Sequence, residues 1–435
     1  MAARDAADGE LVVAYVIDPT LWASAGAVRR AWLARTLEAT NEEYDGELTL
    51  LWGQPREVIP ALAERVGARS VHVTRETTPF GRRRDDAVSG VLAAAGVEWV
   101  ETGTPYAVGP GLALNGSDAP YKVFTPFARA WRAHGWPDPA PRPRDLPLRS
   151  ARNDAEATRA IAEAIAAPDL PDLPPAGEAA ALARWRGFLE NSLTAYAGDR
   201  DVPGTDGTSQ LSPHLKLGTV HPRTLLADLA QHRGVGKETF VDELGWREFY
   251  ADVLWHNPSS AWSDLRGALT GMSYDEPTDA IEAWRTGTTG YPIVDAGMRQ
   301  LLATGWMHNR VRMITASFLT KDLHVWWPVG ARHFLDHLID GDIASNNHGW
   351  QWVAGTGTDA SPYFRVFNPV TQGEKFDADG DYVRQWVPEL AHLSGKAAHQ
   401  PWEQPDGYAQ GYPQRIVDHA EERREALRRL GELKD

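Results

Sequence analysis

The stretch Asp340-Gly341-Asp342-Ile343-Ala344-Ser345-Asn346-Asn347-His348-Gly349-Trp350-Gln351-Trp352 combines carboxylates, amides and indoles within thirteen residues. Carboxylate and amide groups are costly to bury unless other groups pair with them. The segment Trp306-Met307-His308-Asn309-Arg310-Val311-Arg312-Met313 lies about thirty residues upstream and supplies cations. The two segments together indicate a polar pocket for a flat aromatic ligand, or a path for electrons.

Composition sets broad limits on this chain. With 435 residues, of which 24% are charged, it is long enough for two or three domains. The absence of Cys excludes disulfides and thiolate metal sites, and we expect no metal. The net charge of −15 argues against a general nucleic-acid coat protein but permits a local basic groove. The N-terminal apolar run 11–17 is too short to span a membrane, so we expect a cytoplasmic protein with no membrane partner.

The first part of the chain, residues 1–131, alternates between strand and helix patterns. We predict strands at 11–17, 48–51, 70–73 and 99–100, and helices at 28–37, 55–66 and 85–95. This alternation is typical of a parallel, Rossmann-like α/β sheet wound with right-handed crossovers. Residues 132–177 are rich in Pro and predict an interdomain connector, irregular except for one helix at 155–166.

Residues 178–435 show helical spacing almost throughout, which predicts an all-α domain. Gly290-Tyr291-Pro292 opens a helix with Pro in its first turn, and Gly305 closes it. A helix at 308–319 places Asn309, Arg312, Met313 and Ala316 on one face. The charged segment 420–433 predicts a solvated surface helix.

Three local patterns carry chemistry but have ordinary structural explanations. The loop Thr208-Ser209-Gln210-Leu211-Ser212-Pro213-His214 predicts a helix capped by Ser212, whose free amides could hold phosphate. Glu243, Arg247 and Tyr250 share one helical face beside Trp246, where a Glu243–Arg247 ion pair would suffice to explain the pattern. Arg312 and Asp340 predict a partly buried ion pair, which by itself is weak evidence for function.

These segments together closely resemble the DNA photolyase and cryptochrome family, from the α/β part to Phe376-Asp377. The resemblance implies an α/β N-terminal domain followed by an all-α FAD-binding domain. It assigns FAD contacts to Tyr196, Thr208, Ser209, Gln210, Leu211, Ser212, Phe240, Arg247, Asn309, Arg312, Asp340, Asp342 and Asn346. Gln210 replaces the usual basic residue of the family, and His348 replaces the usual glycine; we expect His348 to point to solvent.

The resemblance further implies repair of cyclobutane pyrimidine dimers in ultraviolet-damaged DNA, by an electron from excited, fully reduced FAD. Trp246 and Trp352 would stack on the flipped-out dimer, while Glu243 and Asn309 would bond its base edges. Asn346 would face the reactive central nitrogen of the flavin, where a neutral amide tolerates every charge state of the ring. The implied DNA contacts are Arg200, Glu243, Trp246, Arg247, Tyr250, Asn309, Arg310, Met313, Trp352 and Gln372.

Photoreduction in the family passes electrons to oxidised FAD through three tryptophans. Trp350 matches the proximal member and Trp327 the middle one, whereas the distal position falls on Tyr274. A tyrosine there needs a proton acceptor, for which Asp275 and Glu276 are the neighbours in sequence. Trp262 and Trp284 are alternative exits.

Photolyases of this type also carry an antenna chromophore, either a folate or a deazaflavin. Gly81 occupies the position of the folate-binding glutamate. The segments 80–85 and 27–30 instead resemble the group that binds 8-hydroxy-deazaflavin, so Arg29 and Asp85 are the expected ligands. The alternative is a solvated arginine patch beside an empty pocket.

Three other functions compete with dimer repair. A cryptochrome photoreceptor has the same fold, but Glu243, Trp246, Asn309, Met313 and Asn346 all match the repair set. A six-four photoproduct photolyase usually has a second histidine where this chain has Asn309. An unrelated flavin or nucleotide-binding protein would leave Trp350 and Trp352 without a role. The family resemblance also implies a monomer.

Overall fold

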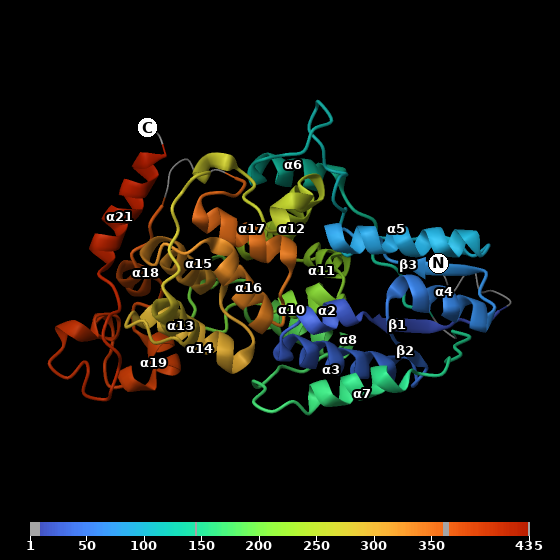
Figure 1. The fold of residues 1–435 in the computed structure, drawn as a ribbon, viewed down its shortest axis with the longest axis horizontal. Helices are drawn as coiled ribbons and strands as arrows, with labels where there is room; N and C mark the ends of the chain where they lie inside the picture. The colour runs from blue at the N-terminus through green and yellow to red at the C-terminus, as the bar shows by residue number, and fades with distance from the viewer. Residues whose placement is uncertain (1–8, 144–145, 360–364, 434–435) are drawn as a thin grey trace.

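The computed structural model describes residues 9–143, 146–359 and 365–433, and it divides into an α/β part and a helical part (Figure 1). The α/β part contains β1 (Val13–Ile17), α2 (Pro19–Ser24), α3 (Ala27–Glu43), β2 (Leu48–Trp52), α4 (Pro55–Val66), β3 (Ser70–Val73), α5 (Pro79–Ala94) and β4 (Glu98–Glu101). Helices α6 (Phe124–His134) and α7 (Ala155–Ile165) follow. Among the described residues, no helix is both long and apolar enough to cross a membrane.

The helical part begins at α8 and contains few other regular elements. Its helices are α8 (Glu178–Asn191), α9 (Tyr196–Asp199), α10 (Ser212–Leu217), α11 (Pro222–Leu229), α12 (Val235–His256), α13 (Thr278–Thr286), α14 (Pro292–Thr304), α15 (Asn309–Ser317), α16 (Trp327–His337), α17 (Ile343–Ala354), α18 (Pro369–Phe376), α19 (Asp381–Trp386), α20 (Lys396–His399) and α21 (His419–Glu432). Short 3-10 turns occur at Pro258–Ala261, Gly267–Leu269, Pro388–Leu390 and Pro401–Glu403, and a π-helical turn at Phe318–Asp322.

The predicted parallel pairing of strands is confirmed, but the strands form two pairs in place of one continuous sheet. β1 pairs with β2 from Val13 opposite Leu48 to Ile17 opposite Trp52. β3 pairs with β4 from Ser70 opposite Glu98 to Val73 opposite Glu101. Strands of four or five residues offer few ladder positions, so each pair depends on the helices packed against it. Helices α3 and α7 lie along one side of β1 and β2, whereas α4 contacts β1 and α5 packs against α4 and β4 (Figure 1).

The Pro-rich segment supplies more than a link between the two parts. Its helix α7 packs against α3 and β2, so this part of the segment belongs to the α/β core. Helix α6 packs against α12 in the helical part, with Phe124 and Trp131 buried. The domain boundaries at residues 131 and 177 remain predictions.

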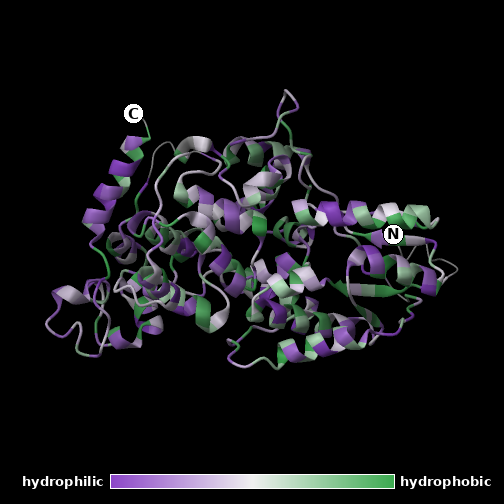
Figure 2. Cartoon of the chain, in the orientation of Figure 1, coloured by the Kyte–Doolittle hydropathy of each residue, from purple (hydrophilic) through white to green (hydrophobic). Residues whose placement is uncertain are grey.

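Hydropathy distinguishes the core elements from the C-terminal helix. Strand β1 is mainly hydrophobic, whereas α21 is mainly hydrophilic (Figure 2). The largest apolar cluster lies among α14, α15, α16 and α17, and it includes the fully buried side chains of Trp284 and Trp327. Helix α14 ends at Gly305 as the sequence predicts, with the left-handed φ of 67° that glycine permits.

Candidate flavin and substrate site

Three helices of the helical part bring the predicted site residues together. Helix α17 packs against both α12 and α15. On each helix the residues assigned to the site are less covered than their neighbours. Asn346 and Trp352 on α17, Trp246 on α12 and Met313 on α15 are half-buried, while the flanking residues are mostly buried. Faces left partly uncovered at the junction of packed helices are the usual setting of a cofactor site.

The predicted Arg312–Asp340 ion pair is confirmed and lies at the centre of this region. The guanidinium of Arg312 donates to both carboxylate oxygens of Asp340, at 3.2 and 2.8 Å. Asp340 is buried, and it also accepts the hydroxyl of Ser212 at 2.6 Å. Arg312 further donates to the Met307 carbonyl at 2.8 Å. A bidentate pair with extra partners holds α10 and α15 in one geometry.

Ser212 is not the helix cap that the sequence predicts. Helix α10 begins at Ser212 itself, and the capping position is Leu211. The prediction is wrong because the Ser212 hydroxyl donates to Asp340 and does not accept an amide of its own helix. The loop before it is held from outside, since Arg184 donates to the carbonyls of Thr208 and Ser209, each at 3.0 Å. No sequence signal pointed to Arg184.

Asp342 makes two interactions at the start of α17, a helix cap and an ion pair. One of its oxygens caps the helix by accepting the Ser345 amide at 2.9 Å. The other accepts the ammonium of Lys216 at 3.1 Å. Burial alone raises the pKa of Asp342, but the charges of Lys216 and Arg247, together with the hydrogen bonds from Ser345 and Lys216, lower that pKa to about 2. Sequence reasoning missed Lys216, although it lies four residues after Ser212 and therefore on the same helical face.

Gln210 has the conformation of a tight turn. Its φ is +50°, and its side-chain amide donates to Asp206 at 3.1 Å. The side chain is exposed. Tyr196 and Phe240 are instead buried, and their rings pack 5.4 Å apart in an aromatic cluster. Of the residues assigned to FAD, these two therefore lie in the core beneath the site.

Glu243 and Arg247, on the α12 face that carries the predicted substrate residues, bond to other elements and not to each other. Glu243 pairs with Arg200 at 2.6 Å, and Arg247 donates to the carbonyls of Pro105 and Leu215 at 2.9 and 3.0 Å. The simple Glu243–Arg247 pair is therefore not formed. Burial raises the pKa of Glu243, and the charge of Arg200 opposes that rise. One face of Trp246 is covered by Phe124, whose ring stacks on it at 3.8 Å.

The expectation that His348 points to solvent is wrong. His348 is fully buried, with its Nδ1 2.8 Å from the Ala344 carbonyl and its Nε2 2.9 Å from the Ser260 hydroxyl. Its ring lies nearly parallel to that of Tyr250, at 5.9 Å. Burial lowers the pKa of His348 to about 4. The imidazole has a polar partner at each nitrogen, which makes its burial acceptable.

Asn346 and two of the indoles predicted to carry electrons lie on α16 and α17. The Asn346 amide donates to the Ala331 carbonyl at 3.1 Å and to Asn347 at 2.9 Å. Trp350 and Trp327 are buried. A Cβ at Gly330 would lie 2.2 Å from the Trp350 ring, so only glycine lets α16 approach that indole. Donation of the Asn346 NH₂ to two protein oxygens fixes the orientation of its amide.

The remaining DNA and antenna candidates have partners of their own. Arg310 pairs with Asp201 at 2.7 Å, and Gln372 is half-buried on α18. Arg29 donates to the Leu335 carbonyl at 3.0 Å, and Asp85 pairs with Arg84 at 2.7 Å. Arg29 and Asp85 thus have different surroundings, on α3 and α5.

An α/β part followed by a helical part with paired carboxylates, hydroxyls and indoles defines a nucleotide-cofactor protein with a helical binding domain. The donor set fits FAD, since hydroxyls and Lys216 suit phosphate and ribose, while Asn346 and Arg312 suit the edge of a flavin ring. The family model for DNA photolyase matches residues 1–144, and that for the FAD binding domain of DNA photolyase matches residues 240–432.

Individual relatives extend this match over most of the chain. A deoxyribodipyrimidine photo-lyase of Streptomyces griseus is 41% identical over 392 residues, which cover 89% of this chain and 85% of that protein. The crystal structure of a bacterial class III photolyase from Agrobacterium tumefaciens superposes with a TM-score of 0.92 at 36% identity, over 100% of this chain and 94% of that one. A cryptochrome of Synechocystis sp. PCC6803 gives 0.87 at 26% identity, over 97% and 94%. This chain belongs to the DNA photolyase and cryptochrome family, and it carries the FAD-binding domain of that family.

Proposed function

We propose that this protein is a deoxyribodipyrimidine photo-lyase, which uses light to split cyclobutane pyrimidine dimers in DNA. One observation carries the proposal. Residues of the repair set lie on α17 and on the two helices that pack against it: Asn346 on α17, Glu243 and Trp246 on α12, and Asn309 and Met313 on α15. Relatives named as this enzyme, such as that of Streptomyces griseus, support the same activity.

The flavin pocket uses the residues around the Arg312–Asp340 pair. When bound in its reduced form, FAD supplies the excited-state electron that opens the dimer. Thr208, Ser209, Gln210, Leu211 and Ser212 would hold the diphosphate. Other contacts fall to Tyr196, Phe240, Arg247, Asn309, Arg312, Asp340, Asp342 and Asn346, with Lys216 added by the geometry.

The substrate pocket would take a flipped-out dimer between two indoles. Phe124 already covers one face of Trp246, which leaves the other face for a base. Stacking on an indole stabilises a base by about 1–3 kcal/mol. Trp352 would supply the second surface, with Glu243 and Asn309 at the polar edges of the bases and Met313 and Tyr250 completing the wall.

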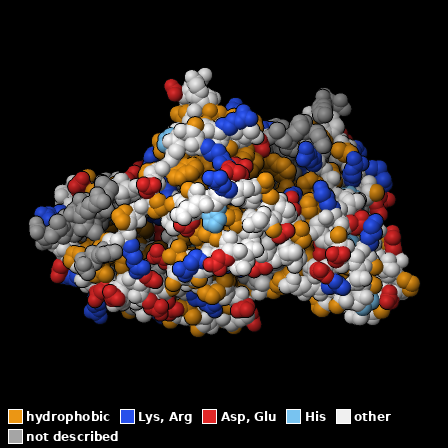
Figure 3. Space-filling view, turned by 180° about the vertical axis from the view of Figure 1, so that it is seen from behind, with side chains coloured by type: hydrophobic (Ala, Val, Ile, Leu, Met, Phe, Trp, Pro, Cys, Tyr) orange, Lys and Arg blue, Asp and Glu red, His pale blue; other side chains and the backbone are white. Residues whose placement is uncertain are grey.

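DNA binding would reorganise two ion pairs at the rim of the pocket. Arg200 pairs with Glu243, and Arg310 pairs with Asp201. Phosphate groups would compete with these carboxylates for the arginines, while Gln372 would contact the strand. Acidic and basic side chains are interspersed over the face seen in Figure 3, so the attraction to DNA would be local. We expect affinity to fall as salt rises, as counterion release requires.

Restoration of oxidised flavin would use Trp350, Trp327 and then Tyr274. The surroundings of Tyr274 differ from those expected, because Arg429 binds both oxygens of Asp275, at 3.0 and 2.8 Å. Trp284 offers an alternative, since its ring lies 6.1 Å from that of Trp350, edge to face.

We assign an 8-hydroxy-deazaflavin to the antenna site in preference to a folate, with Arg29 and Asp85 as its ligands. The support is the sequence pattern around Gly81. The guanidinium of Arg29 already donates to backbone carbonyls of the helical part, so a ligand there would have to share it. Reconstitution with each chromophore separates the two assignments, since only the bound one adds an absorption band and raises photorepair.

Light-dependent repair of ultraviolet-damaged DNA by the reduced protein tests the main proposal. We expect repair by the wild type, and impaired repair by a folded, flavin-bound Asn346→Asp variant, since a carboxylate would repel the reduced anion. Binding of flavin without repair would favour a cryptochrome photoreceptor. Repair of six-four photoproducts alone would favour the other photolyase class. We further propose a cytoplasmic monomer.

A further inference from the structure

Trp327 is fully buried, yet its indole N–H has a charged partner. The indole nitrogen donates to a carboxylate oxygen of Asp264 at 2.7 Å. Asp264 lies between the 3-10 turns Pro258–Ala261 and Gly267–Leu269, and it is half-buried. The carboxylate therefore connects an indole that water does not reach with a more exposed part of the chain.

Tyr274 shares this environment. Tyr274 and Trp327 line one small cavity, together with Lys321, Ala426 and Arg429. Burial raises the pKa of Tyr274 to about 12, and the negative charge of Asp264 contributes to that rise. The charge of Asp264 thus acts on both aromatic side chains.

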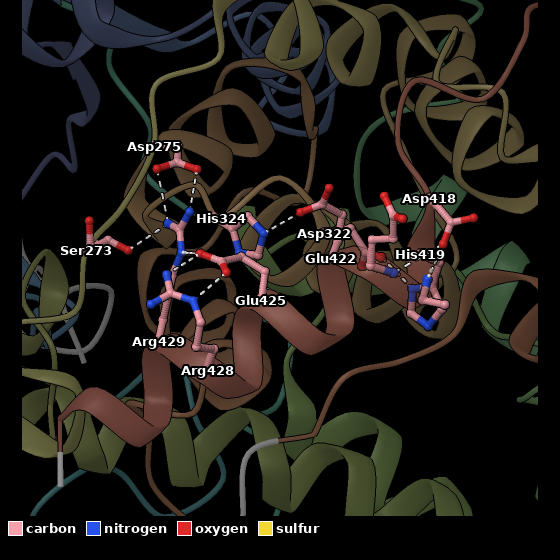
Figure 4. A network of polar contacts seen from close by, with 12 residues as sticks. Ser273, Asp275, Asp322, His324, Asp418, His419, Glu422, Glu425, Arg428 and Arg429 are labelled. Carbon is pink, nitrogen blue, oxygen red and sulfur yellow. Dashed lines mark hydrogen bonds and ion pairs between the residues drawn. The ribbon is translucent and has the colours of Figure 1, made fainter. Parts of the chain in front are cut away.

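The C-terminal helix α21 holds the other nearby carboxylate away from this role. Arg429 donates to the Ser273 carbonyl at 3.1 Å and to both oxygens of Asp275 (Figure 4). Asp275 is therefore neutralised by a paired arginine. Of the acids near this cavity, Asp264 is the one in direct contact with an indole of the electron path.

We propose that Asp264 accepts the indole proton of Trp327 when that residue loses an electron. The inference rests on the proposed electron path. Light-excited oxidised flavin is the oxidant, and the electron reaches it through Trp350. Before any oxidation of Tyr274, Trp327 is left as a radical cation, and its N–H bond breaks. The proton forms an O–H bond on Asp264, which yields a neutral indolyl radical and a neutral carboxylic acid.

The environment favours this proton transfer. Oxidation withdraws electron density from the indole and makes its N–H far more acidic. A buried cation is costly, and the existing short hydrogen bond to Asp264 gives the acidic indole proton a direct acceptor, so its transfer removes the positive charge from the buried indole. The electron that returns to a neutral radical must be accompanied by a proton, which slows recombination and keeps the flavin reduced.

Transient absorption of Asp264→Asn tests the proposal. Asparagine keeps an oxygen for the indole N–H but cannot take its proton. We expect the neutral tryptophan radical of the wild type to be lost and the radical cation to decay by recombination. Asp275→Asn is the matched control, and it should keep the neutral radical. The same neutral radical formed at the same rate in Asp264→Asn would overturn the proposal.

Two further measurements complement this test. The first needs no flavin photochemistry, and the second needs no variant. In the dark protein with ¹⁵N-labelled tryptophan, Asp264→Asn should shift the Trp327 indole resonance, which Trp327→Phe identifies; an unmoved resonance would contradict the contact. In wild-type protein, deuterated water should slow formation of the neutral radical, and an unchanged rate would contradict proton transfer. Dimer repair by chemically reduced protein does not need Asp264, so failure of repair marks failure of the proposed function separately.

Discussion

Arg312 in the helical part and Arg29 in the α/β part both join distant segments, but their partners differ. Arg312 binds the buried carboxylate of Asp340 in a bidentate pair. Arg29 donates to backbone carbonyls of Leu335 and Gly341, at 3.0 and 3.5 Å. A carboxylate partner can be recognised in the sequence because it requires Asp or Glu, whereas every residue has a backbone carbonyl. This difference explains why the sequence predicted the Arg312–Asp340 pair but not the contacts of Arg29.

The largest expected effect is the removal of each arginine in turn. Arg312→Met leaves Asp340 buried without its countercharge, and we expect the free energy of unfolding to fall by about 3–5 kcal/mol. Arg29→Met leaves two carbonyls with a lost donor, and we expect a loss of about 1–3 kcal/mol. Denaturant unfolding measures both, and FAD retention should fall only for Arg312→Met. Equal losses of stability and of bound FAD in the two variants would contradict the difference that we infer between Arg312 and Arg29.

Buried histidines of the helical part should make the protein sensitive to acid. Burial lowers the pKa of His348 to about 4, below the unfolded value of about 6.5. The folded protein therefore binds fewer protons between these values, and its stability falls as pH drops from 6.5 toward 4. The contribution of His348 is about 3 kcal/mol by linkage.

The variant His348→Gln tests this acid sensitivity by unfolding at pH 7 and pH 4.5. It should lose part of the difference in stability between the two conditions. His134→Gln, at an exposed position on α6, is the control and should keep the full difference. An unchanged difference in His348→Gln would show that His348 is not buried as a neutral ring.

Asp342 in the helical part and Asp85 in the α/β part should contribute to stability with opposite dependences on pH. The pKa of Asp342 is lowered to about 2, so its stabilisation is present above pH 3.8 and is lost as pH falls through 2. We expect Asp342→Asn to reduce stability at neutral pH by about 2 kcal/mol. Burial raises the pKa of Asp85, so the contribution of Asp85 to the stability of the fold declines as pH rises through its folded-state pKa. At neutral pH we therefore expect Asp85→Asn to reduce stability only by the loss of the contact with Arg84.

Stability curves of the two asparagine variants between pH 2 and 7 check the signs. Asparagine can still cap α17 through its side-chain oxygen, so the Asp342 effect is mainly electrostatic. A similar pH response in both variants would remove the distinction between the two parts.

The smallest expected effect concerns Gln210, which lies in the loop that we propose holds the flavin diphosphate. Its side chain is exposed, so a charge there gains little. We expect Gln210→Lys to tighten FAD binding by about 0–1 kcal/mol, less than about fivefold. Titration of apoprotein with FAD measures this, with Gln210→Met as an uncharged control of similar length. A much larger gain would mean that the loop closes over the ligand.

Much of the fold could be predicted from local patterns. Helix α4 and strand β3 have the predicted bounds, and Gly305 ends α14 as expected. The grouping of four strands into two pairs was not predicted, because strand–helix alternation does not specify which strands are neighbours. Ser212 and His348 were misplaced because their partners, Asp340 and Ser260, lie 128 and 88 residues away.

The sequence by itself determined the class of site, since carboxylates, amides, indoles and cations occur at helical spacing in two short segments. It also determined the ion pair of Arg312 with Asp340, because buried opposite charges must find each other. Only the tertiary structure decided that Lys216 lies against Asp342, that Phe124 covers one face of Trp246, and that Asp264 receives the Trp327 indole. These contacts join elements far apart in the chain, and local spacing carries no information about which surfaces will meet.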